Sequence, residues 1–597
     1  MGRPEIPVEP VRNNAPRSRG WVKPLVAALC LLPMLYPPTR SMVVDRAQSL
    51  VMDSVAWSTP MADLKSNPNK HAGECKQASA LSPSWDVSSL LEGKKDRIIT
   101  WLSNAVKIPT EIFDEMGPIG EDKRWDVFYE FADYLEKVFP LSHEQLTRTR
   151  VQTHALVYEW PGSDPSLKPL LFLAHQDVVP VLEDTRHLWT HDPYGGEYDG
   201  KYIWGRGSMD DKSGLIGALS AIELLLESGK FNPTRTVILA LGCDEETGGK
   251  VGAYHMGKWL EAKYGKDSMA LIVDEGGGMG ELFGQVFALP AVAEKGYLDV
   301  ELKVDTSGGH SSVPPPHTGI GYAALAVTEI ERHPHVPYLN PESPLVSFIG
   351  CTAKYAPLPD EFKRQVKKLT DGLAKDKVDK QALKKVEAFW TAYAGRAGTA
   401  AITTTQAIDI IAGGAKINAL PEVVTAYINH RISIASSVEA VQERITDVLK
   451  SMASKFNLDF EAFGTVIHAQ DKAAGKLTLA EAWNSSLEPA PVSPYTVESP
   501  AWRLLSGTTK SVYATRPDVM RKYSDGIHMA PFMTTGNTDT KRYWNLTRNI
   551  YRFAYLIFQG TFNNAHTVDE YIEADMFVEQ VRWFANFIVN VDESRDI

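Results

Sequence analysis

Short apolar runs alternate with longer amphipathic stretches through the first half of the chain. The runs include PLLFLA at 169–174, TVILALGC at 236–243 and MALIV at 269–273, whereas KSGLIGALSAIELLLESG at 212–229 has the apolar spacing of a helix. Strands that alternate with helices along a sequence favour a mostly parallel sheet with helices on both faces. We therefore expect an α/β domain that begins near residue 84.

A different pattern begins near residue 297. YLDVELKVDT at 297–306 alternates apolar and polar residues, as a half-exposed antiparallel strand does. Further helices and strands are expected at 320–333, 401–411, 423–433, 437–456 and 458–463. They predict a small α+β domain over 297–466 with one open sheet face. A charged helical stretch at about 340–398 is interpreted as an insertion into this domain, with most of its charge in solvent.

The chain is expected to return to the first domain at 467. Residues 84–296 and 467–597 would then form one larger domain in two parts, because 597 residues are too many for a single hydrophobic core. Near the C-terminus, NIYRFAYLIFQG at 549–560 and ADMFVEQVRWFANFIV at 574–589 are both predicted to be helices.

The amino terminus has the pattern of a secretory-pathway signal. A basic segment precedes the apolar run LVAALCLLPMLY at 25–36, and such a basic flank before a short apolar core is typical of these signals. We interpret residues 1–45 as an uncleaved signal anchor with its basic end in the cytosol, a cleaved signal peptide being the alternative, and 46–83 as a linker. Glycosylation sequons at Asn484 and Asn545 are compatible with a lumenal location.

Composition limits the possible partners and cofactors. The net charge of −12 leaves no broad basic face for nucleic acid. The four cysteines are too few for a disulfide framework, and they lack the spacing of a metal or redox motif. A bound metal would therefore need histidine and carboxylate ligands.

Such ligands follow three of the predicted strands. His175-Gln176-Asp177, Asp244-Glu245-Glu246 and Asp274-Glu275 each come directly after an apolar run, and Asp210-Asp211 begins a helix. The carboxyl ends of the strands in an open parallel sheet are where functional groups collect. Oxygen and imidazole ligands suit zinc or a similar divalent ion, and two such ions sharing a carboxylate can promote amide hydrolysis.

The ordered motifs HQD, GRGSMDDK, DEETGG, GGHSS, GNTDT and NNAHTVDE resemble those of the zinc aminoacylase/carboxypeptidase family, which includes bacterial succinyl-diaminopimelate desuccinylases and carboxypeptidase G. The resemblance covers residues 85–590. It implies a zinc-exopeptidase-like catalytic domain, a smaller lid or dimerisation domain, and two Zn²⁺ ions per chain. The amino terminus and LIVDEGGG are similar to fungal vacuolar members, which implies the vacuole lumen or its membrane.

The resemblance also assigns roles to individual side chains. One zinc would be held by His175 and Asp274, the other by Glu246 and His566, and both by Asp210. Glu275 is an alternative to Asp274, and His528 is an alternative to His566.

In the same family pattern, Asp177 would orient His175. Glu245 would be the general base that takes the proton of a water shared by the metals. His310 would stabilise the oxyanion, from the same chain or from a dimer partner. The substrate would be held by Asn418, Arg431, Gly536 and Asn537.

These assignments predict a carboxypeptidase that acts on short peptides and cleaves the amide next to a free carboxylate. An N-acyl-amino-acid amidase, working in either direction, is the alternative. An inactive receptor or scaffold is a third possibility. A homodimer is possible through the open sheet of the smaller domain, unless the insertion blocks it.

Overall fold

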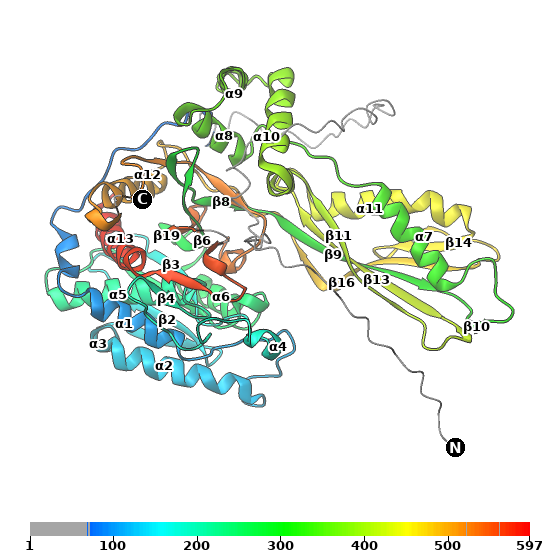
Figure 1. Cartoon of the computed structure of the whole chain (residues 1–597), viewed down its shortest axis with the longest axis horizontal. Coiled ribbons are helices and arrows are strands. Elements are labelled where there is room, and N and C mark those ends of the chain that lie inside the picture. Colours follow the sequence, from blue (N-terminus) through cyan, green and yellow to red (C-terminus); the bar gives the residue numbers. More distant parts are fainter. Residues whose placement is uncertain (1–68, 70–71, 521, 560–561) are drawn as a thin grey trace, which may run out of the picture.

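The computed structural model describes Asn69 and residues 72–597 apart from 521, 560 and 561. A larger domain contains the C-terminus, and a smaller one extends away from it (Figure 1). The predicted signal anchor of residues 1–45 and most of the predicted linker lie outside the described residues. Within the described part of the chain, no helix is both long and apolar enough to cross a lipid bilayer.

A ten-stranded sheet forms the centre of the larger domain. Its middle strands β5, β3, β6 and β19 are parallel, and β2 and β1 continue the sheet beyond β5 in antiparallel pairing. At the other side, β8 and β18 follow β19, while β7 and β17 extend from β6. The strands are β1 (Thr147–Val151), β2 (Ala155–Trp160), β3 (Leu170–His175), β5 (Val237–Gly242), β6 (Leu271–Leu282), β7 (Gln285–Ala288), β8 (Ala291–Glu294), β17 (Ile527–Met529), β18 (Phe532–Thr534) and β19 (Ile550–Ile557).

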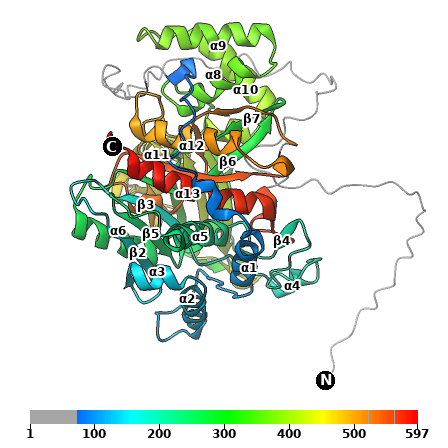
Figure 2. The same ribbon diagram turned by 90° about the vertical axis from the view of Figure 1, so that its left-hand side faces the viewer.

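Helices cover both faces of this sheet, which confirms the predicted α/β architecture. Along β3, Leu170 and Phe172 pack into one hydrophobic core, while Leu171 and Leu173 pack into another on the opposite face. Helices α1, α5, α12 and α13 contribute to the first core, α6 to the second and α2 to both (Figure 2). These helices are α1 (Lys95–Val106), α2 (Val127–Val138), α5 (Lys212–Ser228), α6 (Gly252–Tyr264), α12 (Pro500–Ala514) and α13 (Ala574–Glu593); α3 (Pro140–Gln145) and α4 (Glu183–Arg186) are shorter.

The smaller domain is a six-stranded sheet with two helices on one face. The strand order is β11-β13-β9-β16-β14-β15, and residues along β9 alternate between buried and half-buried, as its sequence predicts. The elements are β9 (Gly296–Asp305), α7 (Gly319–Arg332), β11 (Thr405–Gly413), β13 (Val423–Ile432), α11 (Val438–Lys455), β14 (Leu458–Ala462), β15 (Thr465–His468) and β16 (Gly475–Leu487). A two-stranded ribbon of β10 (Gly309–His310) and β12 (Ala419–Leu420) lies at its far end (Figure 1).

The smaller domain continues past the predicted boundary at 466. Strand β16 pairs with β9 and β14, so the sheet extends to Leu487 before the chain returns to the larger domain. The predicted boundary passed over the alternation at 476–480, and beyond it a bulge between Glu481 and Ser486 interrupts the pattern.

The insertion forms three helices, α8 (Pro344–Tyr355), α9 (Asp360–Leu373) and α10 (Lys380–Ala401). Although these helices interrupt the smaller domain in sequence, they share a hydrophobic core with the larger one. That core joins Phe348, Val366 and Trp390 of the insertion to Phe287 and Phe532 of the larger domain. The insertion is therefore a third layer on the edge of the larger domain, at the junction of the two domains (Figure 1).

A disulfide joins Cys75 to Cys351 in α8 and attaches the segment before the larger domain to the insertion. The sequence analysis missed this bridge because it considered the cysteines only as a framework, and partners 276 residues apart have no recognisable spacing. The predicted helix at 549–560 was also wrong. Residues Ile550–Ile557 form β19, a central strand whose apolar residues are buried on both faces.

Candidate metal centre and substrate clamp

Acidic and imidazole side chains converge at the carboxyl ends of the central parallel strands. His175 is the last residue of β3, Glu245 and Glu246 lie in the 3-10 turn that follows β5, and Glu275 lies within β6. Two separate segments add Asp210, just before α5, and His566, in the loop that leads to β20 (Tyr571–Glu573). The fold thus brings together groups that are almost 400 residues apart in sequence.

These side chains form two groups around His175 and His566. The Nε2 of His175 lies 3.1 Å from Oδ1 of Asp210 and 3.5 Å from Oε1 of Glu275. The Nε2 of His566 lies 3.1 Å from Oδ2 of Asp210 and 3.1 Å from Oε1 of Glu246. Each carboxylate oxygen of Asp210 therefore faces a different imidazole, as expected of a carboxylate that bridges two cations.

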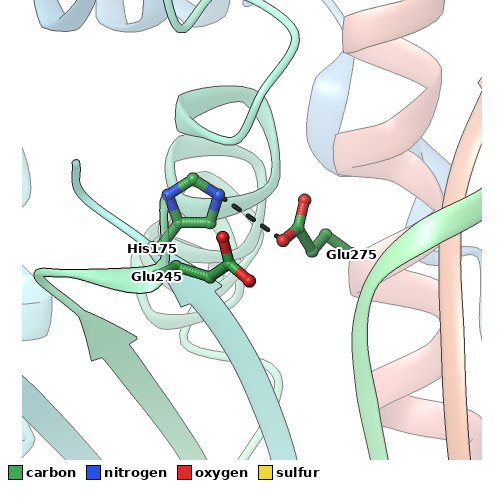
Figure 3. A group of neighbouring side chains, drawn as sticks. All are labelled: His175, Glu245 and Glu275. Atoms are coloured by element: carbon green, nitrogen blue, oxygen red, sulfur yellow. Dashed lines mark ion pairs between the residues drawn. The ribbon is translucent and has the colours of Figure 1, made fainter. Parts of the chain in front are cut away.

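Two overlapping sets of donor atoms have the spacing of a metal site. The donor atoms of His175, Glu245 and Glu275 lie within 4.8 Å of one another, and so do those of His175, Asp210 and Glu246. Figure 3 shows the first set, in which the carboxylates of Glu245 and Glu275 lie close to the imidazole of His175.

The electrostatics of these groups show an excess of negative charge. Burial lowers the pKa of His175, but the surrounding carboxylates, Glu275 foremost, raise it well above its ordinary value. Hydrogen bonds to Asp210 and Glu246 raise the pKa of His566 to about 11. Burial raises the pKa of Glu275 well above its usual range, and the neighbouring carboxylate of Asp210 adds to the effect. The excess of carboxylates therefore favours the binding of a cation between these side chains.

The residues fit a pair of divalent cations. Carboxylate oxygens and imidazole nitrogens without a thiolate suit zinc and similar ions, and the cations would provide the missing counter-charge. The described geometry thus supports a metal centre at the place that the sequence predicted.

The carboxylate of Glu275 lies beside His175, although the sequence predicted Asp274 as the ligand. Asp274 is buried beside it, where its Oδ1 accepts a hydrogen bond from the backbone N–H of Glu275. In β6 the register shifts, because Arg552 pairs with Asp274 and the next residue of β19 pairs with Gly277. Such a bulge changes the direction of a side chain. Alternation along the strand could not show which acid points to His175, and the choice between Asp274 and Glu275 as the ligand stays a prediction.

Asp177, which the sequence predicted to orient His175, lies in contact with its imidazole. The Nδ1 of His175 lies 2.9 Å from the backbone oxygen of Asp177 and 3.5 Å from its carboxylate Oδ1. The other carboxylate oxygen accepts a hydrogen bond from the backbone N–H of Glu246. Asp177 therefore connects β3 to the turn that carries Glu245 and Glu246, and it directs Nε2 of His175 towards the centre.

The loop that carries His566 is strained and anchored to the Asp210 segment. His566 has a φ of 61°, and Asn563, Asn564 and Asp569 also have positive φ values. Glu570, which is fully buried, accepts hydrogen bonds from the backbone N–H groups of Met209 and Asp210 and from Arg206. The competing candidate His528 stacks on Tyr355 in the insertion and belongs to neither group.

A second cluster lies where the two domains meet. Nη1 of Arg431, in β13, donates a hydrogen bond of 3.2 Å to Oδ1 of Asn537, which belongs to the larger domain. The Arg431 guanidinium also lies over the ring of Tyr297. Gly536 precedes Asn537 in an exposed turn. Arg431, Gly536 and Asn537, predicted from the sequence to bind substrate, are thus brought together; we call them the substrate clamp.

His310 and Asn418 lie elsewhere. They are exposed and adjacent, since β10 pairs with β12 and Ser311 donates a backbone hydrogen bond to the carbonyl of Asn418. Figure 1 places this ribbon at the end of the smaller domain that is remote from the larger one. Within one chain, these two predicted residues are therefore separated from the metal centre.

The fold and the site define a metal-dependent hydrolase. The chain belongs to the peptidase family M20/M25/M40, which it matches over residues 171–590, and it is therefore a metallopeptidase. Among its relatives, carboxypeptidase S from Saccharomyces cerevisiae is 38% identical over 537 residues, which are 88% of this chain and 90% of that protein. The resemblance inferred from the ordered motifs is confirmed.

Another relative carries a different activity in its name. The N-fatty-acyl-amino acid synthase/hydrolase PM20D1 from Homo sapiens is 31% identical over 503 residues, 83% of this chain and 88% of that protein. Human carnosine dipeptidase 1 has the same fold, with a TM-score of 0.55 at 15% identity over 86% of this chain and 100% of that one. An M20-family metallo-carboxypeptidase from Sulfolobus solfataricus aligns with a TM-score of 0.52 at 19% identity, over 84% and 99%.

Sequence reasoning missed two supporting residues near these clusters. Glu570 lies four positions after His566, in a segment quoted for its histidine alone. Lys295 lies at the start of the smaller domain, where only the strand pattern was considered. Each of them lies beside another charged residue, Asp569 or Glu294, so neither stood out in the sequence.

Proposed function

We propose that this protein is a carboxypeptidase that binds two Zn²⁺ ions and hydrolyses the amide next to a free carboxylate in short peptides. The observation that carries the proposal is the shared carboxylate of Asp210 between His175 and His566. Each imidazole has a second acid beside it, Glu275 and Glu246 respectively. When bound, the two ions would polarise the scissile carbonyl and make a water molecule more acidic.

Side chains of the protein would carry out the proton transfer and hold the substrate. Glu245 lies in the same group as His175 and Glu275, where it can accept the proton of the attacking water and pass it to the leaving amine. Asp177 holds the His175 ring in place. Arg431, with Asn537, offers a planar cation that can pair with the substrate carboxylate through two hydrogen bonds.

The test of this function is a substitution of the base. Glu245→Ala should keep two bound zinc ions per chain but lose nearly all turnover of a blocked dipeptide, by a factor of roughly 10³ or more. Glu136→Ala, which removes an exposed acid paired with Arg148, is the control. Turnover that survives in Glu245→Ala would contradict the assignment.

A second candidate function is hydrolysis or synthesis of N-acyl amino acids. The similarity to PM20D1 supports it, and such substrates also contain an amide next to a free carboxylate. Both functions would use the same base and the same substrate clamp. Comparing the hydrolysis of a blocked dipeptide with that of a fatty-acyl amino acid, each with and without a chelator, separates them.

A homodimer would place His310 and Asn418 near a metal centre. Strand β11 is at the edge of the smaller sheet, and its Ile410 and Ile411 are 50% and 57% exposed. The insertion packs on the larger domain and leaves this strand uncovered within the described residues. Pairing of two such edges would let each chain present its β10–β12 ribbon to its partner.

The location proposed from the sequence is the secretory pathway, with the vacuole lumen or membrane as the destination. The Cys75–Cys351 disulfide supports this proposal because structural disulfides persist in oxidising compartments. Attachment to a membrane would depend on the segment 1–45. Peptide mapping without reducing agent, on protein purified from its own compartment, would detect the bridge or refute it.

A further inference from the structure

Lys295 is a fully buried lysine at the crossing between the two domains. It lies between the end of β8 at Glu294 and the start of β9 at Gly296. Its ammonium donates hydrogen bonds to two backbone carbonyls, those of Ala400 at 3.1 Å and Thr403 at 2.7 Å. Ala400 lies in the last turn of insertion helix α10 and Thr403 lies two residues beyond its end at Ala401, where the helix dipole favours a cation.

The backbone of the same residue holds the substrate clamp. The carbonyl oxygen of Lys295 accepts a hydrogen bond of 2.7 Å from Nδ2 of Asn537. This bond fixes the amide so that its Oδ1 faces Nη1 of Arg431. Hydrogen bonds therefore connect α10 to the side chain of Lys295, the carbonyl of Lys295 to Asn537, and Asn537 to Arg431.

Glu294 holds the rest of the same turn. Its carboxylate accepts hydrogen bonds of 3.0 Å from the backbone N–H of Thr538 and 3.0 Å from the hydroxyl of Thr540. The buried guanidinium of Arg552 balances its charge at 2.9 Å. Two consecutive residues at the domain crossing thus position the turn that carries Asn537.

A purely structural role explains this lysine poorly. An ammonium is costly to bury, and an apolar side chain could attach the insertion to the larger domain at a lower cost. Burial and the nearby Arg431 lower the pKa of Lys295 to about 7, so this environment disfavours the charged form of the lysine. An anion that binds at Arg431 would relieve this conflict.

We propose that Lys295 is a positioning residue for the substrate carboxylate, through which insertion helix α10 holds Asn537 and Arg431 in the orientation that binds it. The proposal rests on the proposed role of Arg431 in the substrate clamp. Lys295 itself does not touch the substrate. Its loss would shift Asn537, and a misplacement of about 1 Å in a positioning group is enough to weaken binding by an order of magnitude or more.

The test compares Lys295→Met with Lys510→Met. Lys510, in α12, also donates to a backbone carbonyl, that of Ala78, but is remote in the fold from the substrate clamp. For a blocked dipeptide, Lys295→Met should raise KM about tenfold, the effect of one hydrogen bond to a charged group, and change kcat by less than about threefold. The inhibition constant of the product acid should rise in parallel, whereas that of its amide should not. Lys510→Met should leave all of these values unchanged.

A double-mutant cycle with Arg431→Ala completes the test. If Lys295 acts through Arg431, the double variant should have nearly the same KM as Arg431→Ala alone. Additive effects, or a Lys295→Met variant with the KM of Lys510→Met, would overturn the inference. An Arg431→Ala variant that still distinguishes the product acid from its amide would instead refute the proposed substrate clamp.

Thermal unfolding shows whether each variant is folded. If Lys295→Met does not fold, Lys295→Gln replaces it, because the amide keeps one donor to the carbonyls of α10. This variant should raise KM by a smaller factor, still without loss of kcat. An unchanged KM in folded Lys295→Gln would also overturn the inference.

Discussion

Glu275→Gln should remove one bound cation from the protein, whereas Asp274→Asn should not. The two substitutions are matched, since each replaces a carboxylate with an amide of the same size in the same strand. They differ in what the carboxylate faces. Oε1 of Glu275 lies 3.5 Å from Nε2 of His175, while Oδ1 of Asp274 accepts a hydrogen bond from the backbone N–H of Glu275.

The size of the difference follows from these contacts. Two unit charges at a separation of about 3.5 Å interact by roughly 4–5 kcal/mol at an effective dielectric constant of about 20. The loss of Glu275 should therefore weaken the cation on the His175 side by about 10³-fold or more. The amide oxygen of an Asp274→Asn variant can still accept the backbone N–H. Its effect on affinity should stay within about 10–100-fold, the range of residues that only support a ligand.

Zinc content measured after equilibration with chelators of graded affinity is the suitable assay. The wild type and Asp274→Asn should both retain two ions per chain at a free zinc concentration where Glu275→Gln retains one. Circular dichroism of each variant checks that the fold is kept. If Asp274→Asn retained one ion per chain and Glu275→Gln retained two, the reasoning would be refuted and Asp274 would be the ligand.

Three other expectations follow from the structure. If His310 acts in the partner chain, mixed inactive His310→Ala and Glu245→Ala chains should recover about a quarter of wild-type activity, and no recovery would exclude action in trans. Burial lowers the pKa of His430 to about 4, so the unfolded chain binds more protons between pH 6.5 and 4. Stability should fall by up to about 3 kcal/mol as the pH drops through this window, and a denaturant titration of His430→Leu should show a weaker dependence. Cys351→Ser should lose about 2–5 kcal/mol of stability, and a reducing agent should lower the urea midpoint of the wild type only.

The sequence was sufficient for the fold class and for the place of the site. Short apolar runs such as those at 169–174 and 236–242 are typical of buried strands. If these strands are parallel, the polar residues that follow them lie at one edge of the sheet. This reasoning predicts that His175, Glu245 and Glu246 lie together. The ordered motifs added Asp210 and His566, which come from segments that strand patterns do not connect.

Details that depend on tertiary contacts were out of reach. Asp274 and Glu275 are adjacent acids, and only the bulge opposite β19 decides which of them points towards His175. The strand β19 itself looked helical, because a segment buried on all sides has no periodicity that distinguishes the two structures. The insertion was assigned to the smaller domain since sequence order gave no sign of the core that it shares with Phe287 and Phe532.

The two domains are proposed to contribute different parts of the site, and this explains why the site alone does not distinguish a carboxypeptidase from an N-acyl-amino-acid amidase. In the proposed function the larger domain would provide the metal ligands and Glu245, while the smaller domain would provide Arg431 at the domain junction. The junction would then fix the distance between the amide that is cleaved and the carboxylate that Arg431 holds. Peptides and N-acyl amino acids share this distance and differ only on the acyl side of the amide. Selectivity between them must therefore come from side chains on the acyl side of the metal centre, away from Arg431, and variants of the substrate clamp should affect both substrate classes equally.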